Sequence, residues 1–222
     1  MGAGMSRIDL LTDAARMCVS SAIKGKANPL VAFSGGKDAI VAGHIAKSVG
    51  VTQFVCEESW YFRPQTNSIK QIAERLGFDV VYKNSLGIDW LRKNKRIIFS
   101  MDSALRGWSF LVRQQATVKR HAKQIGSECQ IFGRRTQENS VPSTIYQTKD
   151  GTQCHPLREW RTEDIWDYMA KHGIEKPFIY QTRYGANGPF YALHPKNHGM
   201  TVQQCWQWVQ SIDERYYEGM LA

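Results

Sequence analysis

The sequence lacks any hydrophobic run long enough to cross a membrane. No apolar stretch approaches the roughly 18–20 residues that a spanning helix needs. The first 17 residues are polar and are interrupted by Asp9 and Asp13, unlike a secretory signal. We therefore expect a cytoplasmic protein with no membrane segment.

Paired cysteines are also absent. No two cysteines form a C-x-x-C pair, so zinc-ribbon and iron–sulfur spacings have no local support. We expect no iron–sulfur cluster and predict reduced, mostly buried thiols. The five cysteines are scattered at positions 18, 56, 129, 154 and 205.

Two common nucleotide-binding loops are missing as well. The sequence contains neither the G-x-x-x-x-G-K-[ST] loop of kinases and GTPases nor the G-x-G-x-x-G dinucleotide fingerprint. It shows no internal repeat and no low-complexity linker. If the chain binds a nucleotide, it uses another kind of loop.

What the sequence does have is an ordinary globular composition with an excess of positive charge. Its 222 residues suit one domain with a small appended lobe, and 42% apolar and 22% charged residues are typical values. The formal net charge of +9 indicates an anionic partner, either a nucleotide, a nucleic acid or both. Simple solubility is the alternative explanation of this charge.

Short apolar runs alternate with helical periodicity along the first 132 residues. Such alternation predicts an α/β fold with a doubly wound, mostly parallel sheet and helices on both faces. Strands are predicted over residues 29–33, 51–56, 79–82 and 129–132, and helices over 8–23, 38–48, 65–76 and 103–125.

The pattern changes after Gly133. Residues 134–160 are polar and irregular, with a hairpin turn predicted at 149–151. Thr162 is predicted to cap a helix that runs to about His172, followed by an ordered loop over 177–199 and a last helix over 201–220. We therefore predict an N-terminal helix (1–28), a nucleotide-binding domain (29–160) and a C-terminal helical lobe (161–222).

The strongest functional signal is a glycine turn between the first strand and the next helix. Glycines let backbone N–H groups approach phosphate oxygens closely, and the helix dipole adds positive potential there. Lys37 supplies a full charge, while Asp38 would repel phosphate unless it orients Mg²⁺ or caps the helix. An ordinary strand-to-helix turn is the alternative. The predicted nucleotide contacts are Ala32, Phe33, Ser34, Gly35, Gly36, Lys37 and Asp38.

Two further groups follow strand ends, where open α/β sheets bind ligands. Arg134 and Arg135 are predicted to project from this edge and hold phosphate or sulfate in a two-pronged grip, with a solvated basic turn as the alternative. Glu57 and Glu58 end the second strand. Their carboxylates or backbone groups are predicted to receive a ribose hydroxyl or the adenine amine, unless one of them only caps the next turn.

The string Ser34-Gly35-Gly36-Lys37-Asp38 resembles the signature of the PP-loop ATP pyrophosphatase superfamily. Within it, the chain is most similar to the phosphoadenylyl-sulfate (PAPS) reductase family, which includes the small subunit of sulfate adenylyltransferase. The resemblance covers about residues 29–185 and rests on three further motifs in the family order. These are residues 57–62 (EESWYF), 133–138 (GRRTQE) and 155–168 (HPLREW followed by DIWDY).

The resemblance implies an adenine nucleotide alpha hydrolase-like fold and a ligand that is ATP or a related adenine nucleotide. It implies cleavage of the α–β phosphate bond, adenylylation of an anionic substrate and release of pyrophosphate. Lys37, Arg134 and Arg135 become the predicted catalytic residues, Gly133 joins the predicted nucleotide contacts, and Asp38 becomes a predicted Mg²⁺ ligand. A homo-oligomer or a partner subunit is also implied.

Three departures from the family pattern keep other functions open. The tail, residues 213–220, has no cysteine for thiol attack on sulfur, residues 111–116 lack the Cys-Cys pair of iron–sulfur members, and Ala39 stands where serine is usual. The alternatives are a sulfur-transfer or nucleic-acid modification enzyme, a reductase-like protein without the usual catalytic cysteine, and a non-catalytic nucleotide-binding partner subunit.

Overall fold

A computed structural model describes residues 6–58, 63–83, 115–137 and 141–181, together with residues 201, 203, 204, 207 and 211. The chain forms two compact units. The first comprises Met1–Cys56, Ile72–Val81 and Val118–Glu175, and the second comprises Glu57–Gln71, Tyr82–Thr117 and Lys176–Ala222.

The described strands form one six-stranded sheet in the order β3-β2-β1-β4-β6-β5. β1 pairs in parallel with β2 and β4, and β4 pairs in parallel with β6. β5, on the edge, pairs antiparallel with β6, because a tight turn joins the two strands. The strands are β1 Leu30–Ala32, β2 Gln53–Glu57, β3 Val80–Lys83, β4 Cys129–Phe132, β5 Ile145–Thr148 and β6 Gly151–Cys154.

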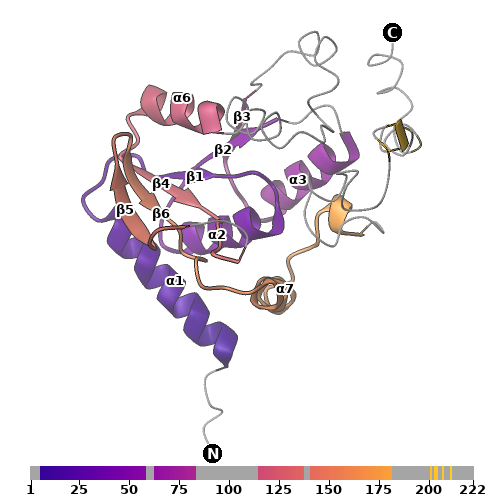
Figure 1. The fold of residues 1–222 in the computed structure, drawn as a ribbon, viewed down its shortest axis with the longest axis horizontal. Helices are drawn as coiled ribbons and strands as arrows, with labels where there is room; N and C mark the ends of the chain where they lie inside the picture. Colours follow the sequence, from indigo (N-terminus) through magenta and orange to yellow (C-terminus); the bar gives the residue numbers. More distant parts are fainter. Residues whose placement is uncertain are drawn as a thin grey trace, which may run out of the picture. The chain divides into compact units, whose positions relative to one another are not determined.

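Helices cover both faces of this sheet, which confirms the doubly wound prediction. α1 and α2 contact the strands from one face, with α7 packed against both helices, whereas α6 covers the opposite face (Figure 1). The helices are α1 Arg7–Ile23, α2 Lys37–Ser48, α3 Arg63–Arg75, α6 Ala116–Ile125 and α7 Thr162–Lys171, with a 3-10 helix at Phe178–Gln181.

The core under α6 is made of small and branched aliphatic residues. Leu30 and Val55 of β1 and β2 pack there against Val118 and Ala122 of α6. On the α2 face, the Phe54 and Phe78 rings stack 4.5 Å apart. The glycine at position 43 of α2 makes room for them, since a Cβ there would lie 3.1 Å from the Phe54 ring.

The two ends of α7 are tied to α1. The Arg7 guanidinium donates to both oxygens of Asp164, at 2.9 and 3.1 Å, and Lys171 pairs with Asp9. The predicted N-cap at Thr162 is wrong by one residue. Arg161 occupies that position, and its backbone N–H donates to the Asp164 carboxylate at 2.8 Å.

The hairpin predicted at 149–151 is confirmed between β5 and β6. The predicted division at residues 28 and 160 stays a prediction. Residues 103–114 of one predicted helix, residues 182–199 of the predicted loop and most of the predicted helix over 201–220 lie outside the described residues. Within the part of the chain that the structure describes, no helix has the length and apolarity required to cross a bilayer.

Candidate functional site

The glycine turn lies at the point where the strand order reverses. From β1 the chain continues to β2 on one side, while β4 pairs with β1 on the other. The loops after β1 and β4 therefore leave the same carboxyl edge side by side, which is the usual ligand crevice of open α/β sheets. The last residues of the two strands, Ala32 and Phe132, are register partners, so the segments that follow them start at one site.

The turn itself has the geometry of an anion-binding loop. Gly35 has a φ of +71°, which glycine adopts without the steric cost that a side chain would bring. Gly36 is the N-cap of α2, and no side chain caps the helix there. The first amides of a helix have no acceptor within it, so the N-terminus of α2 presents donors and a positive dipole end beside this turn.

Lys37 and Asp38 form the first turn of α2 and carry opposite charges. The Lys37 side chain is only 3% exposed, and its ammonium donates to Asp38 Oδ2 at 2.7 Å. The second oxygen, Asp38 Oδ1, accepts from Arg135 Nε at 2.5 Å. Two cations and one carboxylate therefore lie together at the start of α2.

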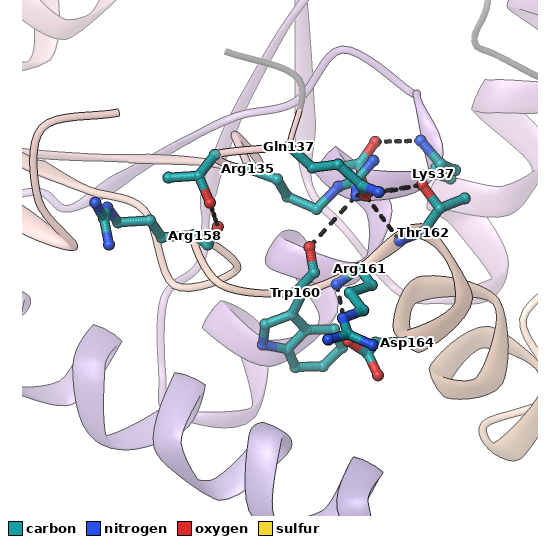
Figure 2. Close-up of polar contacts among 10 residues, drawn as sticks. Lys37, Arg135, Gln137, Arg158, Trp160, Arg161, Thr162 and Asp164 are labelled. Carbon is teal, nitrogen blue, oxygen red and sulfur yellow. Dashed lines mark hydrogen bonds and ion pairs between the residues drawn. The ribbon is translucent and has the colours of Figure 1, made fainter. Parts of the chain in front are cut away.

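Arg135 is a fully buried residue, and its predicted grip on phosphate or sulfate stays a prediction. Besides Asp38, its guanidinium donates to Gln137 Oε1 at 2.7 Å and, through longer contacts, to the Trp160 carbonyl and the Thr162 hydroxyl (Figure 2). Burial of a guanidinium requires such a set of acceptors. These contacts are those of a positioning residue that links α2 to the start of α7.

The segments after β4 and β6 are joined to each other beside Arg135. Thr136 donates to the Arg158 carbonyl through both its N–H, at 2.9 Å, and its hydroxyl, at 2.8 Å. Gln137 extends the link, since its Oε1 also accepts from the Thr162 N–H at 3.2 Å (Figure 2). Sequence reasoning missed Gln137 and Thr162, whose polar character alone gave no signal of this role.

Gly133 allows the end of β4 to approach the first turn of α2. A Cβ at this position would lie 2.5 Å from both the carbonyl carbon and the carbonyl oxygen of Asp38, and 2.7 Å from the Ala39 nitrogen. No side chain fits at such distances, so glycine is required here for packing. Gly133 as a nucleotide contact stays a prediction.

Arg134 differs from its neighbour because its side chain lies over an aromatic ring. Its guanidinium carbon is 5.0 Å from the centre of the Phe132 ring. Burial lowers the pKa of Arg134, an effect that Tyr146 partly offsets. The guanidinium stays charged at any physiological pH, since the unperturbed pKa lies above about 12. Arg134 as the grip on an anionic substrate stays a prediction.

His155 is a buried neutral histidine beside Arg134. Its ring stacks against both Phe132 and Tyr146, with centroid distances of 5.5 and 5.4 Å. Burial, and then the charge of Arg134, lower the pKa of His155 to about 4. The sequence analysis named His155 only as part of a motif. In the structure, its ring packs against the Phe132 ring on which Arg134 lies.

Phe33 and Ala32 belong to the sheet and its core. Ala32 packs against the cluster under α6. The Phe33 ring packs edge-on against Phe54 and Phe78, at 6.4 and 5.6 Å, and the side chain is 1% exposed. The Phe33 N–H donates to the Val55 carbonyl at 2.8 Å. The Phe33 ring thus packs in the core beside the start of the turn, and Phe33 as a nucleotide contact stays a prediction.

Glu58 belongs to the second unit, where its carboxylate pairs with the Lys70 ammonium. Its N–H donates to the Lys83 carbonyl at 3.0 Å, and Lys70 lies 4.9 Å from the centre of the Tyr82 ring. Glu57 ends β2. Glu57 and Glu58 as contacts of the ribose or the adenine stay predictions.

The described residues contain no group of three or more His, Cys, Asp or Glu side chains that fits a metal ion. The two oxygens of Asp38 accept from Lys37 and Arg135. Asp38 as a Mg²⁺ ligand stays a prediction.

Comparison with known proteins decides the family. Residues 28–191 match the family model described as the phosphoadenosine phosphosulfate reductase domain. The chain belongs to this family. The resemblance predicted from four short motifs is thereby confirmed.

Two curated relatives are subunits of sulfate adenylyltransferase. The chain is 26% identical to sulfate adenylyltransferase subunit 2 1 of Shewanella sediminis and 26% identical to sulfate adenylyltransferase subunit 2 of Shewanella woodyi. Each match covers 69% of this chain and 60% of the relative, so the chain spans less than two thirds of the length of these proteins.

Two solved structures share the fold. PAPS reductase from Candida auris, in a phosphate complex, has a TM-score of 0.60 at 14% identity, over 83% of this chain and 94% of that chain. NMN synthetase from Francisella tularensis has a TM-score of 0.63 at 14% identity, over 94% of this chain and 87% of that chain. Identity this low supports the adenine nucleotide alpha hydrolase-like fold alone.

Proposed function

We propose that the chain binds ATP, with its phosphates on the turn at residues 34–38, and transfers the adenylyl group to an anionic acceptor. The observation that carries this proposal is the group of Lys37, Asp38 and Arg135 at the uncapped N-terminus of α2. It combines two cationic side chains, backbone donors and a place at the switch point of the sheet.

In the proposed reaction an oxygen of the acceptor attacks the α-phosphorus of ATP. The bond between that phosphorus and the oxygen bridging to the β-phosphorus breaks, and pyrophosphate leaves with the electron pair. Negative charge then grows on the leaving group, where the amides of the turn and the Lys37 ammonium stabilise it. Arg134 would hold the acceptor through its guanidinium.

Arg135 would act through Asp38 rather than on the substrate. Without Arg135, the Asp38 carboxylate would keep Lys37 as its cation and lose the second one. With Arg135 present, Asp38 is held by a second cation, so the Lys37 ammonium can turn toward phosphate without leaving a partly buried carboxylate unpaired. This explains why a fully buried arginine stands next to a phosphate loop.

Sulfate is the first acceptor to test. The curated relatives are named subunits of sulfate adenylyltransferase, which also suggests a partner subunit. Sulfate matches the chemistry proposed for Arg134, because a guanidinium binds tetrahedral oxyanions through paired N–H groups. Because these relatives are named as subunits, the second candidate function is that of a non-catalytic nucleotide-binding partner subunit.

Pyrophosphate release from ATP tests the reaction. The purified chain is incubated with ATP and, in turn, sulfate, small carboxylic acids, tRNA and DNA, with and without Mg²⁺. We expect release with one class of acceptor and a loss of at least about 100-fold in Lys37→Met. ATP binding without release under any condition would favour the non-catalytic subunit, and release that Lys37→Met leaves unchanged would contradict the proposed role of the turn.

A further inference from the structure

Two cysteines that the proposed function does not use lie next to each other in the first unit. The Cys18 Sγ on α1 is 3.5 Å from the Cys154 Sγ at the end of β6, although 136 residues separate them in the sequence. Both are free thiols in the structure. A disulfide needs an S–S distance of about 2.05 Å, so the sulfurs would have to approach by about 1.5 Å.

The surroundings leave one thiol accessible and one enclosed. Cys18 is partly exposed on α1, next to Met17, which is 71% exposed, whereas Cys154 is fully buried. A small oxidant can therefore reach Cys18 first. Cys154 lies beneath it, already in contact and shielded from solvent.

Hydrogen bonding between the two sulfurs fits these unequal roles. The contact with Cys154 lowers the pKa of Cys18, which favours the thiolate at the accessible position. The same contact and burial raise the pKa of Cys154, which keeps that thiol protonated. The thiolate is the nucleophile in thiol oxidation, so Cys18 is the residue prepared to react.

We propose that Cys18 and Cys154 form a reversible disulfide when a peroxide oxidises the protein. The Cys18 sulfur attacks one oxygen of hydrogen peroxide, breaks the O–O bond and becomes a sulfenic acid, with one water released. The Cys154 sulfur then attacks the Cys18 sulfur, and its proton leaves with the hydroxyl group as a second water. The two thiols lose two electrons, and the peroxide gains them.

Cys129 is the competing partner. β4 and β6 are parallel, with Ile131 opposite Cys154 and Cys129 two residues earlier on β4, so the three side chains share the face that α1 covers. Burial is the main cause that raises the pKa of Cys129, to about 11. The sulfurs of Cys18 and Cys154 lie 3.5 Å apart, in direct contact, so we expect the bridge to form between these two cysteines.

The bridge would fasten α1 to β6 without involving the phosphate turn. Ion pairs of Arg7 and Asp9 already hold the first turn of α1 against α7. Oxidation would add a second attachment of the same helix, at Cys18. The proposal is independent of the proposed function. Failure of one leaves the other standing, because thiol state and pyrophosphate release are measured separately.

Mass spectrometry of the oxidised full chain tests the bridge. Fully reduced protein is treated with hydrogen peroxide, its remaining thiols are alkylated under denaturing conditions, and intact masses and peptides are compared with an untreated sample. We expect two of the five cysteines to escape alkylation, a mass lower by about 2 Da before alkylation, and one peptide pair that joins Cys18 to Cys154. Dithiothreitol should restore all five thiols.

Variants make the result specific. Cys18→Ser should abolish the bridge, and we expect this variant to fold because Cys18 is partly exposed. Cys154→Ala removes the buried partner and should also abolish the bridge. Cys56→Ala is the matched control that should keep it, since Cys56 is buried on β2. Five alkylated thiols after peroxide treatment, a bridge through Cys129 or Cys205, or a bridge between two chains would overturn the proposal.

Discussion

At the scale of single residues, Arg135 decides the charge at the start of α2. It is fully buried and provides the second cation for Asp38, whereas Arg134, next to it in the sequence, lies over the Phe132 ring. Two adjacent arginines therefore have different surroundings. We propose that Arg135 holds the turn in place and that Arg134 contacts the acceptor.

Replacing Arg135 tests this division of roles. Arg135→Met leaves Asp38 with one cation and Gln137 without its guanidinium partner, so we expect the free energy of unfolding to fall by about 3 kcal/mol. ATP affinity should fall by about tenfold or more, because the net charge at the turn drops by one. Urea denaturation and calorimetric titration measure the two effects.

Arg134→Met is the matched control for that experiment. It removes the same charge from a side chain that packs on a ring rather than on Asp38. We expect a smaller change in the free energy of unfolding than in Arg135→Met. The loss of activity should appear mainly in how the reaction rate depends on acceptor concentration. Equal effects of the two substitutions on ATP binding would contradict the assignment.

His155 gives a prediction at the same scale for the effect of pH on stability. Its pKa of about 4 in the folded protein lies below the value of about 6.5 expected in the unfolded chain. The unfolded state therefore takes up the proton first, and stability falls as the pH drops from about 6.5 toward about 4. We expect His155→Phe to have a flatter stability curve over this window, measured by urea denaturation at a series of pH values.

The comparison with His155→Phe removes the contribution of other histidines. Burial also lowers the pKa of His44 and His172, so both contribute to the pH dependence of the wild type and of the variant alike. A variant curve that matches the wild-type curve between about pH 4 and 6.5 would show that His155 does not titrate as the structure indicates.

At the scale of elements, the close contact between the end of β4 and the first turn of α2 positions the site. Gly133→Ala would place a Cβ 2.5 Å from the Asp38 carbonyl, so α2 must shift. We expect the free energy of unfolding to fall by about 2–3 kcal/mol and ATP affinity to fall with it. Denaturation and titration again measure the effects.

Gly25→Ala is the control for Gly133→Ala. Gly25 has a φ of +68°, and a Cβ there meets no atom within 4 Å. The substitution brings backbone strain of about 1 kcal/mol without moving the turn, so ATP affinity should stay at the wild-type value. If Gly133→Ala also left ATP affinity unchanged, the contact between β4 and α2 would have no part in binding.

Sequence patterns predicted the elements better than their contacts. The bounds of β4 match the prediction at both ends because an apolar run lies between polar residues and a glycine. The cap of α7 was misplaced because Arg161 takes the N-cap position while Asp164 supplies the hydrogen bond. Nothing in a pair of arginines shows which one is buried, since that depends on acceptors from distant segments such as Trp160 and Thr162.

At the scale of the whole molecule, the family and the fold follow from sequence and structure together. Four motifs in one order predicted the family that residues 28–191 match, and the six-stranded sheet places two of the loops that carry them at its switch point. The acceptor could not be predicted in the same way. In the proposed function, the choice of acceptor depends on the shape and charge of side chains around Arg134, which local sequence patterns do not encode.

The central claim is that the turn at residues 34–38 holds the phosphates of an adenine nucleotide. Calorimetric titration of ATP into the wild type and into Lys37→Met tests it most directly, because the methionine keeps most of the buried stem of the side chain and removes the charge. The account predicts ATP binding by the wild type and an affinity about 10–100-fold lower in Lys37→Met. No ATP binding by the folded wild type, or equal affinity in the two proteins, would contradict it.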